Sequence, residues 1–173
     1  MAEQRVFGLD AQVVFRGKPM RVAGRMLLEG ASGQSTFRYL LIDEAGAPVV
    51  LEQAAANRYA LLRPFPPAAR PPTQGNTITI GVERYTLVGV RRLKVLELLG
   101  QATGAVTRAE LLVSGMYEGL MGTLMREMVP GTNRQVYYLV RPVGTDDVLS
   151  AAAHAEARAA ESRAAAADAG DDD

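Results

Sequence analysis

The fold of this chain is decided by Val13-Val14-Phe15-Arg16-Gly17-Lys18-Pro19-Met20-Arg21-Val22-Ala23-Gly24, which is matched 65 residues later, without a gap, by Ile78-Thr79-Ile80-Gly81-Val82-Glu83-Arg84-Tyr85-Thr86-Leu87-Val88-Gly89. The pattern of both copies predicts a strand, a tight turn and a second strand that ends at a glycine. We therefore predict two similar small β-subunits, neither large enough to close a core alone, with a barrel-like closure as one arrangement. Chance similarity between two hairpins is the alternative interpretation.

Other apolar runs bounded by turn residues predict the remaining strands. The stretch Arg91–Gly100 fits either a helix capped by its glycine or a continuation of the strand through Gly89, and its place after the second hairpin favours the strand. Residues 109–113 would correspond to residues 38–42 at a slightly shifted offset. The expected strands outside the two hairpins are Thr36–Ile42, Pro48–Glu52, Arg58–Leu62 and Gln135–Val140.

One segment has helical spacing instead. Apolar residues recur at i, i+3 and i+4 from Tyr117 to Met128, and Pro130-Gly131 would end such a helix. We predict a short Met-rich helix here. Its methionines fill the core or form an adaptable partner-binding surface, and the candidates for that surface are Met116, Met121, Met125 and Met128.

Composition divides the chain into four parts. Residues 1–65 form the first β-subunit, residues 66–75 a Pro-rich linker, residues 76–150 the second β-subunit and residues 151–173 an Ala-rich acidic tail. Prolines exclude a helix or a central strand from the linker, which also resembles a short ligand for an aromatic groove. Alanine favours helix, so we expect the tail to be helical when it is ordered.

The formal net charge of zero hides a separation of charge. The 173 residues contain 19 Lys+Arg and 19 Asp+Glu, but residues 151–173 carry two arginines against six acidic residues. The tail therefore has a net charge of −4 and the body +4. The densest basic cluster is Arg91, Arg92 and Lys94; on a strand, the last two share a face and Arg91 points away. The cluster is a solvated face or a dock for an acidic tail, its own or a partner's.

Several chemistries lack their residues. The chain has no Cys and one His, which lies in the tail (His154), so neither a thiolate nucleophile nor a His-rich metal site is expected. A nucleophile elbow and a phosphate-binding loop are absent. A basic surface with stacking aromatics, as nucleic-acid binding needs, is not indicated. We expect no catalytic residues, no cofactor and no metal, and the lack of a signal peptide or long apolar run favours a cytoplasmic protein.

The body resembles the bacterial family catalogued as domain of unknown function 4178. The resemblance covers about residues 6–140 and is better in the first half. The chain departs from the family by having no tryptophan; Phe37 stands close to the position where the family usually has one. The resemblance implies a β-rich accessory module encoded near membrane-stress proteins of the phage-shock type, and it transfers no functional residues. It is carried by Phe7–Val13, Gly17–Gly24, Tyr39–Glu44, Leu51, Tyr85–Leu87 and the region of Gly115.

The leading functional hypothesis is a non-catalytic, cytoplasmic protein-interaction module in an assembly at or near the membrane. Its partner is another protein or a second copy, and peripheral membrane association is compatible with it. One alternative is a small-molecule binder or a carboxylate-dependent enzyme with a site between the two halves. Another is a phage-like or injection-particle structural protein.

Overall fold

The computed structural model describes residues 6–64, 73–101 and 110–168. Within these ranges, twelve strands form one antiparallel sheet, followed by a single α-helix, so the predicted mainly-β, barrel-like fold is confirmed. The elements are β1 (Gln12–Phe15), β2 (Lys18–Gly30), β3 (Ser35–Ile42), β4 (Pro48–Ala54), η1 (Ala55–Asn57), β5 (Arg58–Pro64), β6 (Thr73–Gln74), β7 (Thr77–Ile80), β8 (Glu83–Gly100), β9 (Leu111–Gly119), β10 (Gly122–Met128), β11 (Gln135–Val143), η2 (Thr145–Asp147), β12 (Val148–Ser150) and α1 (Ala151–Asp168).

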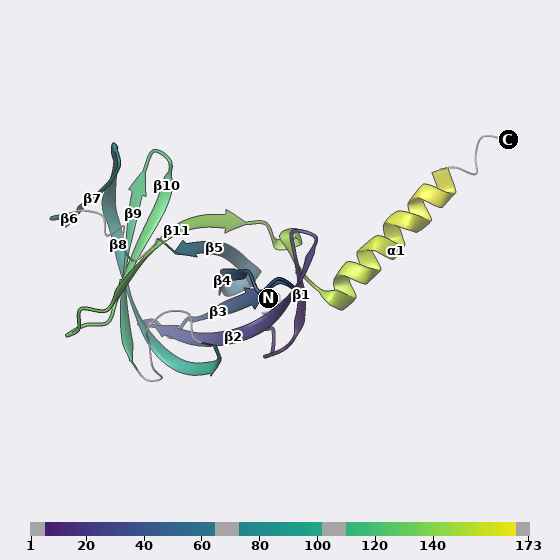
Figure 1. The fold of residues 1–173 in the computed structure, drawn as a ribbon, viewed down its shortest axis with the longest axis horizontal. Helices are drawn as coiled ribbons and strands as arrows, with labels where there is room; N and C mark the ends of the chain where they lie inside the picture. Colours follow the sequence, from purple (N-terminus) through teal and green to yellow (C-terminus); the bar gives the residue numbers. More distant parts are fainter. Residues whose placement is uncertain (1–5, 65–72, 102–109, 169–173) are drawn as a thin grey trace.

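Eight of these strands close into a ring (Figure 1). Their order is β2-β3-β4-β5-β11-β10-β9-β8, and β8 pairs back onto β2. Both seams of the ring, β5–β11 and β8–β2, join residues before the linker to residues after it. Each part of the chain therefore supplies four strands to one barrel, and neither closes without the other.

The two predicted hairpins have the same register. Val13 faces Met20 in the β1–β2 hairpin, and Ile78 faces Tyr85, each 65 residues later, in the β7–β8 hairpin. Both second strands also contain a bulge at the same place, between Val22 and Gly24 in β2 and between Leu87 and Gly89 in β8. A bulge bends its strand, so both hairpins leave the ring in the same way.

The correspondence extends to the seams. Corresponding residues of β2 and β8 are 65 positions apart in the chain. Those of β5 and β11 are 76 apart, because the connection from β8 to β9 is longer than the connection from β2 to β3. Each seam is then symmetric about a central pair, as an approximate two-fold axis requires. The seam pairs are Leu28–Val95, Glu29–Lys94 and Gly30–Leu93 in one, and Leu62–Val140, Arg63–Leu139 and Pro64–Tyr138 in the other.

Both faces of the ring are buried over much of their area. The inner face carries clusters around Met26 and Leu93 and around Leu62 and Met125. The outer face of the first half is packed beneath β1, β12 and Phe7, and that of the second half beneath β7. Strands buried on both faces lose the alternation of apolar and polar residues that single-sided strands show.

This two-sided burial explains why the prediction of a Met-rich helix is wrong. Residues 111–128 form β9, a tight turn at Leu120-Met121, and β10. Leu124 and Met125 are neighbours that point to opposite faces, and both are fully buried. The expected correspondence of residues 109–113 with 38–42 is also wrong: the register places Leu41 opposite Val22 as it places Tyr117 opposite Leu87. The preferred strand reading of Arg91–Gly100 is correct, since that stretch ends β8.

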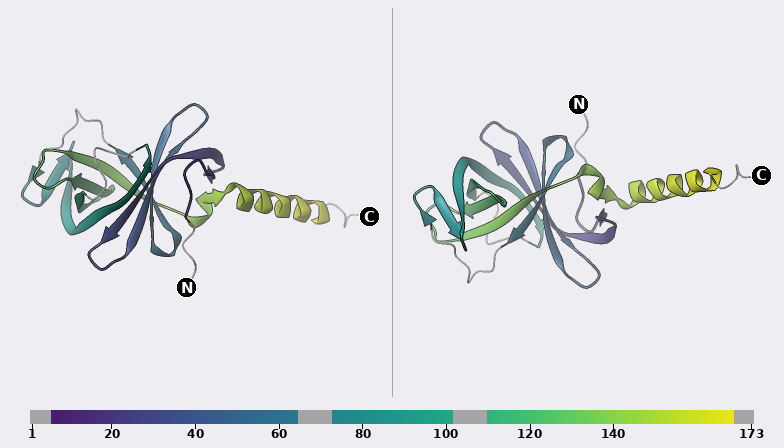
Figure 2. Two further views of the ribbon diagram at one scale, coloured as in Figure 1. Left: turned by 90° about the horizontal axis from the view of Figure 1, so that it is seen from below. Right: turned by 90° about the horizontal axis from the view of Figure 1, so that it is seen from above.

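The tail forms the helix α1, as predicted, and extends away from the barrel (Figure 2). The Ser150 hydroxyl accepts a hydrogen bond from the Ala153 N–H at 3.2 Å, which caps its first turn. Most described α1 side chains are exposed. No helix in the described ranges has the length and apolar character needed to cross a membrane. The predicted linker lies outside the described residues, except for 73–75, where β6 ends in a turn.

Candidate functional site

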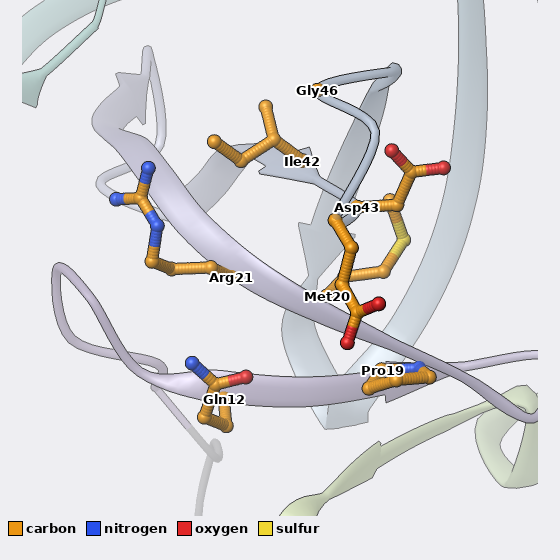
Figure 3. A pocket seen from close by; sticks show the side chains of 8 residues that line it. Gln12, Pro19, Met20, Arg21, Ile42, Asp43 and Gly46 are labelled. Carbon is orange, nitrogen blue, oxygen red and sulfur yellow. The ribbon is translucent and has the colours of Figure 1, made fainter.

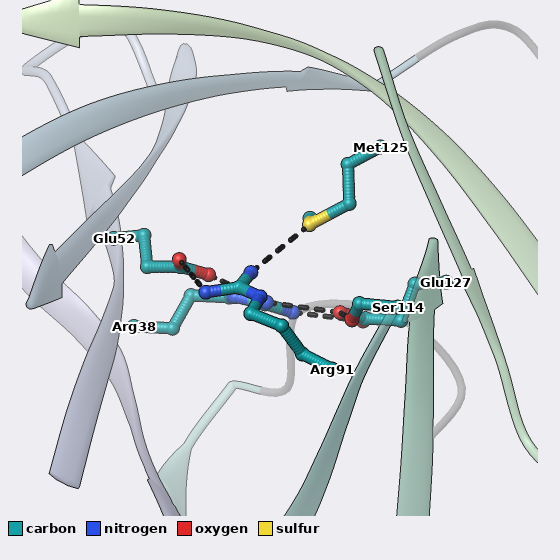
Figure 4. A network of polar contacts seen from close by, with 6 residues as sticks. All are labelled: Arg38, Glu52, Arg91, Ser114, Met125 and Glu127. Atoms are coloured by element: carbon teal, nitrogen blue, oxygen red, sulfur yellow. Dashed lines mark hydrogen bonds and ion pairs between the residues drawn. The ribbon is translucent and has the colours of Figure 1, made fainter. Parts of the chain in front are cut away.

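Four charged side chains from four strands meet inside the ring (Figure 4). Arg38 comes from β3 and Glu52 from β4, in the first half; Arg91 comes from β8 and Glu127 from β10, in the second. Arg38 is completely buried, and the two glutamates are 8% and 5% exposed. We call these four residues the central charge cluster.

Arg38 holds the cluster together. Its Nη1 and Nη2 donate to Glu127 Oε1 and Oε2 at 2.8 and 2.9 Å, a bidentate pair, and Nη2 also donates to Glu52 Oε2 at 2.9 Å. Glu52 Oε1 accepts a further hydrogen bond from Arg91 Nη1 at 3.1 Å. The Ser114 hydroxyl donates to Glu127 Oε2 at 3.2 Å. Two cations and two carboxylates thus balance in a site where Arg38 and both glutamates are buried and Arg91 is partly exposed.

The electrostatic surroundings keep Arg38 and Glu52 ionised. Burial alone would lower the pKa of Arg38, but Glu127 and Glu52 hold it well above its ordinary value. Burial alone would raise the pKa of Glu52, yet Arg38 and then Arg91 lower it below 4.5. Burial raises the pKa of Tyr138, whose ring lies 5.8 Å from the Arg38 guanidinium carbon, to about 12.

This arrangement is suited to holding the halves together. A general acid or base at neutral pH needs a pKa near 7, and the pKa of Glu52 moves in the opposite direction. Within the described residues, no three His, Asp or Glu side chains are placed to hold a metal ion. A buried charge pair that loses one partner costs about 3–5 kcal/mol, so the cluster strongly penalises a barrel whose halves are misplaced.

The sequence patterns do not predict Arg38, Glu52 and Glu127 as site residues. Arg38 lies within an apolar strand, where the alternating pattern predicts that its side chain faces the solvent. A signal did exist: Glu52 and Glu127 occupy corresponding positions of β4 and β10, and each of these strands is the second strand after its hairpin. That signal needs the register of the whole ring, which the two matched hairpins alone do not give.

A second feature lies at one end of the second half, on the two adjacent turns that join β7 to β8 and β9 to β10 (Figure 1). Val82, Leu120 and Met121 are 103%, 100% and 82% exposed. The turns are joined by a hydrogen bond from the Met121 N–H to Glu83 Oε1 at 2.5 Å. We call Val82, Leu120 and Met121 the apolar tip.

The structure separates the predicted binding residues. Arg91 points into the ring, where it binds Glu52 and its Nη2 lies 3.4 Å from Met125 Sδ. Arg92 and Lys94 are exposed on the outer face of β8, so the predicted division of the basic cluster is correct.

The four methionines do not share one surface. Met116 and Met125 are register partners inside the ring, where Met125 is fully buried. Met128 is half-buried on the outer face of β10, and Met121 belongs to the apolar tip. Their helical spacing does not bring them together, because the chain reverses between Gly119 and Gly122.

A surface hollow of about 450 Å³ lies in the first half, between the β1–β2 hairpin and the β3–β4 turn (Figure 3). Its charged lining is mixed: Arg21, which pairs with Asp10 at 2.7 Å, and the carboxylates of Asp43 and Glu44. The hollow does not lie between the two halves, where the small-molecule alternative placed a site.

Fold and site together define a β-barrel of two corresponding halves with an internal charge cluster and an exposed apolar tip. Comparisons of the chain with protein-family models, with curated proteins and with solved structures find no match. The resemblance to the domain of unknown function 4178 family therefore stays a prediction.

Proposed function

We infer that this protein is a non-catalytic protein-interaction module and that the apolar tip is its contact surface. The single observation behind this proposal is the near-complete exposure of three large apolar side chains on two touching turns. Fully burying one such side chain contributes about 1.5–3 kcal/mol, so a partner that covers all three gains a substantial part of a specific affinity.

The first half supports this interpretation because it builds the same two turns without large apolar residues. Its β1–β2 turn is Arg16-Gly17, where the second half has Gly81-Val82. The exposed tip of its β3–β4 turn is Glu44-Ala45-Gly46, where the second half has Leu120-Met121. The fold therefore does not require Val82, Leu120 and Met121, and partner binding accounts for them.

The setting of the module follows from the family resemblance. We place it in the cytoplasm, as an accessory subunit of a membrane-stress or other membrane-associated assembly. The carboxylates that converge between the halves are neutralised by arginines, which favours this role over a carboxylate-dependent enzyme.

Site-specific photocrosslinking tests the proposal. A photoreactive amino acid at Leu120 of the full chain, expressed in its native host, should form a covalent adduct with one discrete protein. The same amino acid at Glu44, at the corresponding turn of the first half, should not. If position 120 forms no adduct and the protein leaves a gently lysed cell as a monomer, the proposal is wrong.

A triple variant separates binding from folding. Val82→Ser, Leu120→Ser and Met121→Ser should abolish co-purification of the crosslinked protein, and the free energy of unfolding should change by less than about 1 kcal/mol because all three are exposed. Glu44→Ser with Ala45→Ser is the matched control and should retain the partner.

A further inference from the structure

The outer face of β8, β9 and β10 forms a second open surface, separate from the apolar tip. Register places Arg92 beside Val113 and Val113 beside Met128. Val90 and Arg126 flank Gly115 in the neighbouring row, and Lys94 faces Leu111. We call this the basic sheet face; its residues are Val90, Arg92, Lys94, Leu111, Val113, Gly115, Arg126 and Met128.

The corresponding face of the first half is covered by the chain itself. Tyr39, Leu51 and Gln53, which correspond to Gly115, Arg126 and Met128, are all completely buried. Phe7 lies over them, with its ring 5.5 Å from that of Tyr39 and its N–H donating to the Tyr39 hydroxyl at 3.3 Å.

The second half leaves this part of its outer face open, beside the part that β7 covers. Val90 is 57% and Leu111 42% exposed, and Arg92 and Lys94 are exposed beside them. The sheet face that is buried in the first half is therefore accessible and basic in the second half.

The charge of this face is complementary to that of the C-terminal tail. Arg92, Lys94, Arg126 and the adjacent Arg134 outnumber the two nearby carboxylates: Glu29, opposite Lys94 on β2, and Glu110, which pairs with Arg134. The face together with these three neighbours thus has a net charge of +2. Residues 151–173 have a net charge of −4 and end in three aspartates.

The direction of α1 carries the helical part of the tail away from the face of its own barrel. The helix α1 starts at β12 in the first half and points away from the second (Figures 1 and 2). Its 18 residues extend for about 27 Å.

We propose that the acidic tail of one copy docks on the basic sheet face of a second copy, which gives a head-to-tail self-association. The alanines of α1 allow its backbone to approach the small and apolar side chains of the face, and its carboxylates meet the arginines and Lys94. The contact joins two different surfaces, so it leaves one tail and one face free and can extend to longer chains or close into a ring.

Sedimentation velocity on the full-length protein tests this proposal. The weight-average mass should rise with protein concentration at low salt and return to that of a monomer at about 0.5 M salt, where the Debye length is only a few ångströms. Arg92→Glu with Lys94→Glu should abolish the rise. So should Asp171→Lys with Asp172→Lys and Asp173→Lys.

Mixing the two charge-reversed variants is the decisive measurement. Each should be monomeric alone, and an equimolar mixture should regain the concentration-dependent mass, because an acidic tail then meets a basic face and a basic tail an acidic face. Lys18→Glu with Arg58→Glu, two exposed cations of the first half, is the matched control and should associate as the unaltered protein does.

Three results would overturn the proposal: an unaltered protein that stays monomeric at low salt, a face variant that still associates, or a mixture that stays monomeric. Thermal unfolding of each variant checks that the barrel is intact. The triple variant of the apolar tip should associate normally, which separates this proposal from the proposed function.

Discussion

Gly24 of β2 allows the backbone of Gln101, just after the end of β8, to approach at a distance that excludes any side chain. A Cβ at this position would lie 1.8 Å from the Gln101 carbonyl oxygen, a backbone atom. That backbone cannot withdraw freely, because the Gln101 N–H donates to the Ala23 carbonyl at 2.9 Å. The β2–β8 seam therefore depends on this glycine.

Gly24→Ala should accordingly destabilise the barrel by about 2–3 kcal/mol or more, as overpacking of a rigid site does. The matched control is Gly89→Ala, at the corresponding position of β8, where no atom lies within 4 Å of the added Cβ. This control should be neutral or slightly stabilising. Urea unfolding followed by tyrosine fluorescence measures both, and equal effects of the two substitutions would contradict the argument.

Glu52 of the central charge cluster should make the barrel sensitive to acid. The folded-state pKa of Glu52 is lowered below 4.5 by Arg38 and Arg91 despite its burial. Its contribution to stability is therefore complete above the unfolded-state pKa and is lost as the pH falls through the folded-state value.

The free energy of unfolding should thus decrease as the pH falls below about 4.5. Between pH 7 and pH 3, the Glu52→Gln variant should lose less free energy of unfolding than the unaltered protein. At pH 7 the variant should be less stable, since Arg38 and Arg91 lose a shared carboxylate. Denaturant midpoints across this pH range decide the question. Parallel pH profiles for the two proteins would show that Glu52 is not responsible.

At the scale of elements, α1 and β12 follow each other in sequence but differ in what they bury. In α1, Ala153 and His154 are half-buried, and the other side chains described as far as Ala164 are exposed. In β12, Val148 is 2% exposed within the outer core of the first half, and the strand pairs with β1.

A chain that ends at Ser150 should therefore keep its barrel, with a loss of less than about 1 kcal/mol, while its helical circular dichroism signal disappears. A chain that ends at Gly144 also loses Val148 and the β1 pairing, and it should be clearly less stable. Thermal unfolding of both truncations measures the difference. Unfolding of the chain that ends at Ser150 would mean that α1 belongs to the core.

The elements also show what the sequence could predict. Hairpins were recognisable because turn residues and apolar runs act locally: Gly17 and Gly81 have φ angles of +77° and +61°, which glycine adopts without strain. The β9–β10 hairpin around Leu124 and Met125 was not recognisable as strands, because burial on both faces produces apolar residues at helical spacing. Ring closure and the meeting of Arg38 with Glu127, 89 residues apart, depend on non-local pairing that no local pattern contains.

For the whole molecule, the approximate two-fold relation accounts for the composition of the central charge cluster. Glu52 and Glu127 correspond to each other, but the arginines do not. Arg38 of the first half corresponds to Ser114, and Arg91 of the second half corresponds to Met26. Each half nevertheless supplies one arginine and one glutamate, so the interior stays neutral.

This compensation predicts a non-additive pair of substitutions. Arg91→Met leaves the interior with a net negative charge, and Ser114→Arg gives it a net positive charge in a filled space, so each should destabilise the barrel by several kcal/mol. Together they give the second half the residues of the first: the new arginine binds Glu127 and replaces Arg91 at Glu52. The double variant should therefore be more stable, by about 2 kcal/mol or more, than the sum of the two single destabilisations predicts. Arg91→Met with Ser114→Met refills the volume without the charge and should show no such recovery. Equal coupling in both pairs would mean that packing, not charge balance, unites the two halves.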